Sequence, residues 1–142
     1  MYEDNPRGAT RAVNYARFLE LVRAYMDQDL PAIANLANFA ALVAEFFDDV
    51  NWAGFYLFDG KKLTLGPFQG KPACTTITLD RGVCGRAAST CATVVVPDVR
   101  RFPGHIACDE ASRSEIVVPL TVNGSGQAVQ GSRYIADFNY KL

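Results

Sequence analysis

The chain has 142 residues, of which 49% are hydrophobic and 20% charged, with a formal net charge of −1 at pH 7. This size and composition predict one compact domain with a buried core and no basic surface for nucleic acid. No apolar run approaches the roughly 20 residues that span a membrane, and the polar N-terminus is unlike a signal peptide, so we expect a cytoplasmic protein whose thiols stay reduced.

Two helices are predicted at the beginning of the chain. Over residues 15–26, apolar side chains recur three and four residues apart: Tyr15, Phe18, Leu19, Val22 and Met26. A second helix is expected after Asp29, which is a good N-cap residue, with Pro31 in its first turn and an apolar stripe that continues to Phe47. Both helices are therefore amphipathic and should cover one face of another layer.

Strands dominate the rest of the sequence. Residues 51–58 are rich in aromatic side chains and lead through Asp59-Gly60, a favourable hairpin turn, into a second strand at residues 61–66. Strands are also expected at residues 75–79 and 93–97, with a short helix at residues 82–89 between them. The continuous apolar run at residues 115–122 indicates a strand buried on both faces. Helices followed by mostly adjacent strands predict an α+β fold.

The cysteines allow three interpretations. Thiolates and His105 are suitable zinc ligands, but the cysteines do not form the close pairs of structural zinc sites, so zinc is disfavoured. A buried, unreactive role fits Cys91 best. Redox chemistry needs an activated thiolate and a second cysteine within reach, and Cys108 suits the first role because its loop is polar. There, backbone amides, His105 or Arg113 could stabilise its thiolate.

Several segments together resemble one enzyme family. The segments are NWAGFYLFDG, LGPFQGKPAC, RGVCGRAA, VVPDV and FPGHIACDEASRSEIVVPL, and they run from about residue 51 to residue 120. They are similar to the free methionine-(R)-sulfoxide reductases, which are built on a GAF domain. The resemblance implies a single GAF domain over residues 1–142, with a central antiparallel sheet and the N-terminal helices packed on one face.

The resemblance also implies a thiol mechanism without a bound cofactor or metal. Cys108 would attack the sulfur of free methionine-(R)-sulfoxide, and the resulting sulfenic acid would form a disulfide with a second cysteine. Cys74 and Cys84 match the other two family cysteines, and we favour Cys74 as the resolving thiol, whereas Cys91 has no counterpart. A thioredoxin-like reductant would complete the cycle, which serves protection against oxidative stress, and the family implies a homodimer.

Three further residues are implied in substrate binding. Trp52 and Tyr56 match aromatic residues that border the pocket for the S-methyl group, although both could be ordinary core aromatics. Glu115 matches a carboxylate that binds the substrate's ammonium or assists protonation of the sulfoxide oxygen, although it could also be a solvated charge at the start of a strand. The alternative function is a non-catalytic GAF module that binds a small molecule or dimerises.

The C-terminus departs from the family pattern. From about residue 129 we expect a closing strand resembling GVLDID, with two substrate-binding aspartates, and then a terminal helix. An alignment on Ala128-Val129 places Arg133 and Ile135 at the two aspartate positions, and Gly131, Ser132 and Arg133 are poor residues for a central strand. This interpretation predicts a missing core strand, a missing helix and weak substrate binding, and it suggests a shifted reading frame between residues 129 and 136.

Overall fold

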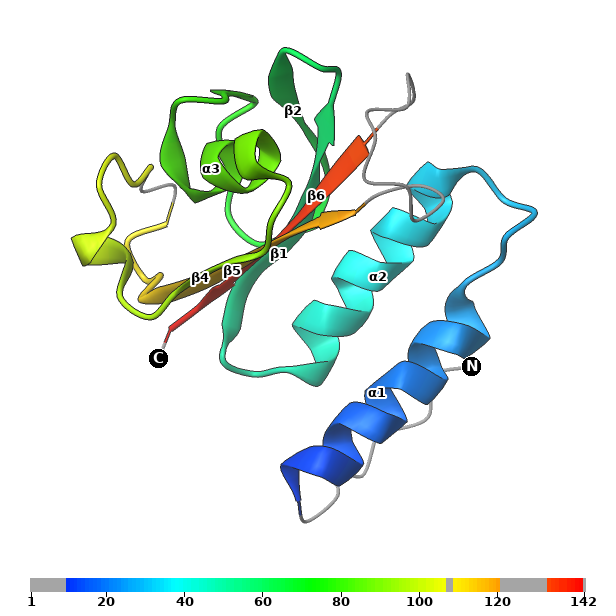
Figure 1. The fold of residues 1–142 in the computed structure, drawn as a ribbon. Helices are drawn as coiled ribbons and strands as arrows, with labels where there is room; N and C mark the ends of the chain where they lie inside the picture. Colours follow the sequence, from blue (N-terminus) through cyan, green and yellow to red (C-terminus); the bar gives the residue numbers. More distant parts are fainter. Residues whose placement is uncertain (1–9, 107–108, 121–132, 142) are drawn as a thin grey trace.

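The computed structural model describes residues 10–106, 109–120 and 133–141. The described strands form one antiparallel sheet with the order β3-β2-β1-β6-β5-β4 (Figure 1). Their bounds are Val50–Phe58 (β1), Lys62–Gln69 (β2), Thr76–Thr78 (β3), Val94–Val96 (β4), Ser114–Leu120 (β5) and Arg133–Tyr140 (β6). The helices are α1 (Arg11–Tyr25), α2 (Ala32–Phe46) and α3 (Gly82–Thr90), with a short 3-10 turn at Val99–Arg101.

The helices lie on both faces of the sheet. Helix α2 packs against β1 and β2 and α1 packs on α2, whereas α3 covers the opposite face (Figure 1). Strand β1 explains this arrangement, because its side chains alternate between the two faces. Ala53 and Phe55 are buried among residues of the N-terminal helices, and Trp52 and Tyr56 are buried on the α3 side. The prediction that both N-terminal helices lie on one face is confirmed.

The helix boundaries and faces differ in part from the sequence prediction. Helix α1 begins after Thr10, whose side chain accepts a hydrogen bond from the Val13 amide. Phe18 is buried, but Tyr15 and Leu19 are each 51% exposed, so the predicted apolar stripe is only partly the buried one. Asp29 is not the N-cap of α2, because Pro31 occupies that position without a side-chain hydrogen bond. Among the described residues, no helix is both long and apolar enough to cross a membrane.

The hairpin and the short strands lie where the sequence predicts them. The Asp59 carboxylate accepts hydrogen bonds from the amides of Lys61 and Lys62, which closes the turn between β1 and β2 around Gly60 at φ +96°. The predicted burial of residues 115–122 on both faces is only partly correct. Within β5, Glu115 and Val117 are buried, whereas Leu120 is 37% exposed.

The C-terminal strand corrects the sequence prediction most strongly. We expected residues 129–136 to lack a central strand, but β6 lies between β1 and β5 and pairs with both along its length. Its side chains alternate as a central strand requires, because Ile135 and Asp137 are buried on the α3 side and Ala136 is buried on the α2 side. The closing strand is present, so the reason for suspecting a shifted reading frame disappears.

Candidate functional site

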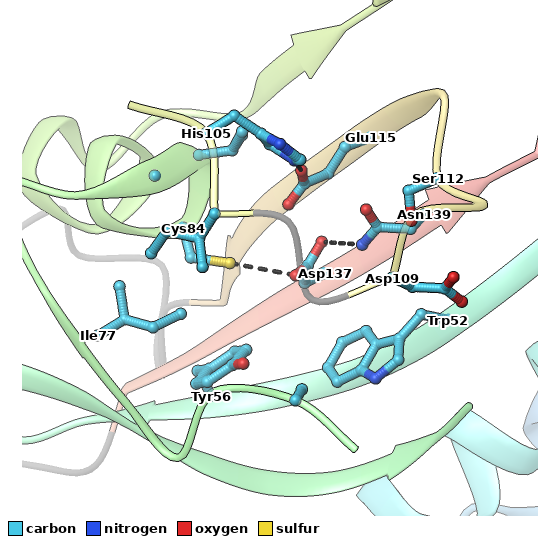
Figure 2. Close-up of a pocket in the computed structure, with 14 residues that line it drawn as sticks. Trp52, Tyr56, Ile77, Cys84, His105, Asp109, Ser112, Glu115, Asp137 and Asn139 are labelled. Carbon is cyan, nitrogen blue, oxygen red and sulfur yellow. Dashed lines mark hydrogen bonds and ion pairs between the residues drawn. The ribbon is translucent and has the colours of Figure 1, made fainter. Parts of the chain in front are cut away.

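A pocket lies between the sheet and the first turn of α3 (Figure 2). The pairing register of the strands determines which residues form the floor of this pocket. Trp52 on β1, Asn139 on β6 and Glu115 on β5 lie opposite one another in one row of the sheet. Asp137 occupies the next row of β6 on the same face, beside Gly54. Cys84 approaches this floor from α3. Three polar side chains and a thiol thus converge under one helix.

Asp137 is the centre of the polar floor. One carboxylate oxygen accepts a hydrogen bond from the Cys84 thiol, with 3.2 Å between Sγ and Oδ2, and the other accepts one from Asn139 Nδ2 at 3.0 Å. Burial, followed by the charge of Glu115 and a hydrogen bond with it, raises the pKa of Asp137 well above its ordinary value of 3.8. Asp137 therefore holds a proton to a much higher pH than an exposed aspartate does.

Glu115 is buried, with 6% of its side chain exposed, so it is not a solvated charge at the strand start. Its Oε2 atom lies 3.4 Å from Nε2 of His105, whose side chain is 15% exposed at the edge of the pocket. The sequence suggested that His105 or Arg113 stabilises a Cys108 thiolate. In the structure, His105 faces Glu115, and the Arg113 guanidinium donates hydrogen bonds to the carbonyls of Glu110 and Ser112.

Trp52 and Tyr56 form the aromatic wall of the pocket. Their rings stack with centroids 6.1 Å apart, and both side chains are almost fully buried. Gly54 lies between them, and a Cβ atom there would come within 2.6 Å of the Trp52 ring, so glycine makes room for the indole. Tyr56 Oη donates a hydrogen bond to the carbonyl of Cys74 at 3.0 Å, and Trp52 Nε1 donates one to the carbonyl of Lys71 at 3.1 Å. The wall therefore also anchors the loop that carries Cys74.

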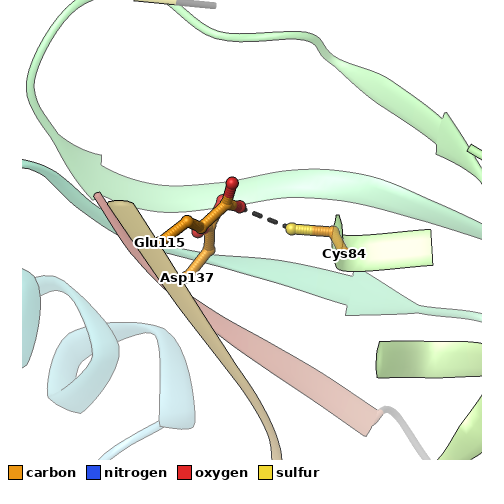
Figure 3. Close-up of side chains that lie close together, drawn as sticks. All are labelled: Cys84, Glu115 and Asp137. Atoms are coloured by element: carbon orange, nitrogen blue, oxygen red, sulfur yellow. Dashed lines mark hydrogen bonds between the residues drawn. The ribbon is translucent and has the colours of Figure 1, made fainter. Parts of the chain in front are cut away.

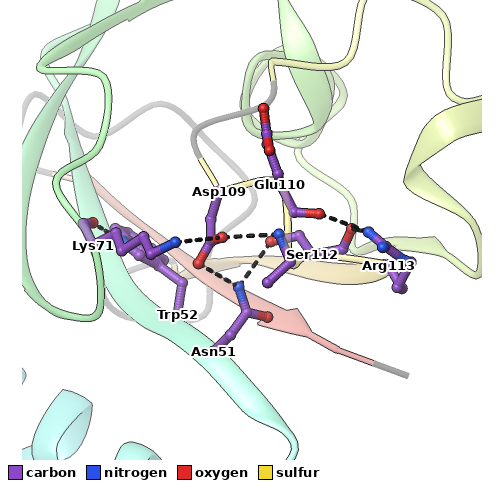
Figure 4. A network of polar contacts seen from close by, with 8 residues as sticks. Asn51, Trp52, Lys71, Asp109, Glu110, Ser112 and Arg113 are labelled. Carbon is purple, nitrogen blue, oxygen red and sulfur yellow. Dashed lines mark hydrogen bonds and ion pairs between the residues drawn. The ribbon is translucent and has the colours of Figure 1, made fainter.

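A polar network joins the loop that carries Cys74 to residues 109–112 (Figure 4). Asn51 is the extra residue of a bulge in β1, and its Nδ2 donates hydrogen bonds to Asp109 Oδ2 at 3.0 Å and to Ser112 Oγ at 2.9 Å. Lys71 Nζ lies 3.5 Å from Asp109 Oδ1. The amide of Ala111 and then the Asn51 side chain lower the pKa of Asp109, which keeps it ionised. Asp109 directly follows Cys108, so this network fixes the chain next to the predicted nucleophile.

The structure describes three of the four cysteines, and their surroundings differ. Cys84 is buried in the pocket and Cys74 is partly buried beside it, packed against the same core cluster. Cys91 is exposed at the C-cap of α3, so the expectation that it is a buried core residue is wrong. The reason is that α3 ends there in a left-handed turn with φ 51°. Cys108 lies outside the described residues.

Asp137 and Asn139 are functional candidates that the sequence alignment missed. Arg133 pairs with Phe58 at the far end of β6, and Ile135 is a buried apolar residue opposite Tyr56, so neither occupies the acidic position. The alternation in Ile-Ala-Asp-Phe-Asn matches the expected Val-Leu-Asp-Ile-Asp if the alignment is moved to residues 135–139. One carboxylate is therefore retained, and an amide replaces the other.

Known proteins identify the family, although no protein-family model matches the chain. Free methionine-R-sulfoxide reductase of Escherichia coli is 50% identical over 108 residues, which cover 76% of this chain and 66% of that enzyme. The enzyme of the same name from Neisseria meningitidis, solved with its substrate, is 39% identical with a TM-score of 0.85, covering 99% of this chain and 81% of that one. The chain belongs to the free methionine-R-sulfoxide reductase family.

The fold of this reductase relative is a GAF domain. A solved GAF domain is 36% identical with a TM-score of 0.85, and the match covers 97% of this chain and 79% of that domain. The pocket leaves about 40 Å³ in which the centre of a water molecule can move. This reductase-family pocket is thus small, and it combines an apolar wall with two buried acidic groups, an arrangement that suits a small zwitterion with a short apolar tail.

Proposed function

We propose that the chain reduces free methionine-(R)-sulfoxide to methionine. The observation that carries this proposal is the pairing of Glu115 and Asp137 beneath the aromatic wall of Trp52 and Tyr56. Buried carboxylates attract an ammonium group, and an aromatic wall accepts an S-methyl group. The free methionine-R-sulfoxide reductase from Neisseria meningitidis was solved in complex with its substrate, and its similarity to this chain supports the same assignment.

The reaction proceeds through cysteine oxidation. The Cys108 thiolate attacks the sulfoxide sulfur, and the oxygen, with one proton, then passes to the cysteine sulfur as its bond to the substrate sulfur and the transient sulfur–sulfur bond break. Methionine leaves, and the cysteine becomes a sulfenic acid. A second thiol then attacks the sulfenic sulfur, forming a disulfide and releasing the oxygen as water. The substrate gains two electrons, and the two cysteines lose them.

Asp137 and Glu115 have different roles in this proposal. Because Asp137 keeps its proton at higher pH, it donates that proton to the sulfoxide oxygen as the oxygen leaves. Glu115 remains available to pair with the substrate's ammonium group. Asn139 holds Asp137 in position through its hydrogen bond of 3.0 Å. A neutral side chain at residue 139 also avoids a further acidic group beside Asp137 and Glu115.

Cys74 is our proposed resolving thiol, with Cys84 as the other candidate. The loop of Cys74 is tied to the chain that follows Cys108 through the Lys71–Asp109 contact and is anchored by Tyr56. Cys84, in contrast, is held against Asp137 on the pocket floor. An external dithiol of the thioredoxin class then reduces the disulfide, which suits a reducing compartment such as the cytoplasm.

A homodimer is the proposed assembly. Helix α1 exposes three large apolar side chains, Val13, Tyr15 and Leu19, each 51% accessible. Tyr15 and Leu19 are four residues apart and so lie on the same side of the helix, and exposed apolar side chains there support an interface with a second copy. Sedimentation equilibrium tests this, because a dimer is expected for the unmodified chain and a monomer for one in which Leu19 is replaced by glutamate.

Replacement of Glu115 by glutamine tests the function directly. Methionine formation from free methionine-(R)-sulfoxide is followed with dithiothreitol as reductant. We expect kcat/KM to fall at least about thirtyfold, because losing one partner of a buried ion pair costs ~2–5 kcal/mol. Glu45→Gln is the matched control, since Glu45 is exposed on α2, and it should behave like the unmodified chain. Equal activity of the Glu115 variant would show that this carboxylate does not bind substrate.

A further inference from the structure

Three side chains that could ligate a metal converge on the pocket floor (Figure 3). Cys84 comes from α3, Glu115 from β5 and Asp137 from β6. All three are buried, with 4%, 6% and 7% of each residue exposed. One ligand atom from each lies within 4.8 Å of the others. Residues separated by 31 and 22 positions in the chain thus meet at one point.

The ligand set and its spacing fit zinc. Zinc binds thiolate, imidazole and carboxylate groups, most often in a tetrahedral arrangement. With Zn–O and Zn–S bonds of ~2.0 and ~2.3 Å, neighbouring ligand atoms in a tetrahedron lie ~3.3–3.5 Å apart. Cys84 Sγ and Asp137 Oδ2 are 3.2 Å apart, and His105 Nε2 is 3.4 Å from Glu115 Oε2. Small movements of the Cys84, Glu115 and Asp137 side chains would therefore bring their ligand atoms into one coordination sphere, and His105 adjoins that sphere through Glu115.

The surroundings of the cluster support a cation for two reasons. Two buried carboxyl groups and a thiol stand together, so a divalent cation relieves the repulsion that full ionisation would cause. Asn139 donates a hydrogen bond to the carboxylate oxygen of Asp137 that faces away from Cys84, and such a second contact orients a metal ligand. The sequence analysis disfavoured zinc because it looked for ligands close together in the chain, whereas these three ligands are far apart in the chain and meet only in the fold.

We propose that Cys84, Glu115 and Asp137 bind one Zn²⁺ ion, with His105 or a water molecule as the fourth ligand. Binding forms one zinc–sulfur bond and zinc–oxygen bonds to Glu115 and Asp137, while the Cys84 thiol and the protonated Asp137 carboxyl group release their protons to solvent without any change of oxidation state. If the proposed function is correct, the ion occupies the place of the substrate's ammonium group. Zinc is then a competitive inhibitor that methionine-(R)-sulfoxide displaces.

Cobalt and zinc titrations of the reduced, metal-free chain test this site. Co²⁺ is added as a spectroscopic probe, and Zn²⁺ affinity is measured by competition with a chromophoric chelator. We expect one ion per chain and a thiolate-to-cobalt charge-transfer band. Cys84→Ser should lose the band and bind Zn²⁺ at least about thirtyfold more weakly, while Cys91→Ser, the matched control with an exposed thiol, should bind like the unmodified chain.

The outcomes separate this proposal from the proposed function. Absence of one-to-one Zn²⁺ binding, or a full-strength cobalt band in Cys84→Ser, would overturn the site, whatever the reductase activity. Circular dichroism checks the fold of Cys84→Ser, and Asp137→Asn provides a second variant that keeps the thiol and should weaken Zn²⁺ binding about tenfold or more. One-to-one binding through Cys84 in a chain that fails to reduce the sulfoxide would uphold the zinc site and reject the function.

Discussion

Asn51 connects the fold to the predicted nucleophile, and its replacement by alanine should affect both stability and activity. The substitution removes the hydrogen bond to the ionised Asp109 at 3.0 Å and the one to Ser112 at 2.9 Å. A hydrogen bond to a charged group contributes ~1.5–3 kcal/mol and one to a neutral group ~0.5–1.5 kcal/mol, so the loss is ~2–4 kcal/mol. Among the described residues, the buried Oδ1 atom of Asn51 has no hydrogen-bond partner. Its removal offsets ~1 kcal/mol of that loss.

The net loss of ~1–3 kcal/mol should appear in two measurements. Urea unfolding of Asn51→Ala should show a lower midpoint with an unchanged slope. Because the bonds order the chain beside Cys108, kcat for sulfoxide reduction should fall by a factor of ~5–150, which corresponds to the same free energy.

A matched control distinguishes a local effect from general destabilisation. Asn35 also makes two hydrogen bonds with Asp27: it accepts one from the Asp27 amide at 3.0 Å and donates one to the Asp27 carbonyl at 2.8 Å. It lies on α2 and does not line the pocket. Asn35→Ala should lower stability and leave kcat unchanged. If Asn51→Ala keeps full activity, or if both variants lose activity in proportion to their stability, the polar network does not position the Cys108 loop.

The remaining predictions concern the thiols and the acidic floor. Cys108→Ser should abolish reduction, because a hydroxyl is too weak a nucleophile and cannot form the disulfide. Cys91→Ser should retain full activity. Turnover by Cys108→Ser would show that another residue is the nucleophile. The raised pKa of Asp137 means that the folded chain binds more protons than the unfolded chain above pH 3.8, so the unfolding free energy should decrease as pH rises toward the folded-state value. Asp137→Asn should flatten this dependence in urea unfolding measured across pH, and equal slopes would contradict the assignment.

The sequence predicted the parts of the fold that depend on local patterns. The Asp59-Gly60 turn, the aromatic strand β1 and helix α3 follow from turn chemistry and side-chain periodicity. The faces of α1 were less predictable, because Tyr15 and Leu19 fit the helical stripe equally well but the packing of α2 selects Phe18. Which stripe is buried depends on tertiary contacts.

The polar part of the site was harder to predict, since it depends on strand register. Trp52, Glu115 and Asn139 meet because the register of β1, β6 and β5 places them opposite one another. The three residues are far apart in the sequence, and their spacing does not predict this register. The alignment on Ala128-Val129 failed because it ignored the alternation that makes Ile135 apolar and Asp137 polar on one strand. Asn51 was missed because a bulge turns it toward Asp109, and bulges have no strong sequence signal.

The most direct test of the central claim is a comparison of three substrates with the unmodified chain. With dithiothreitol as reductant, methionine formation is measured from free methionine-(R)-sulfoxide, from its (S) epimer and from an N-acetylated, amidated (R)-sulfoxide. A small pocket with two buried acidic groups predicts turnover of the first compound alone, because blocking removes the charged ammonium group and the epimer misplaces the sulfoxide oxygen. Reduction of the blocked compound at a similar rate, or no reduction of the free (R)-sulfoxide, would contradict the account.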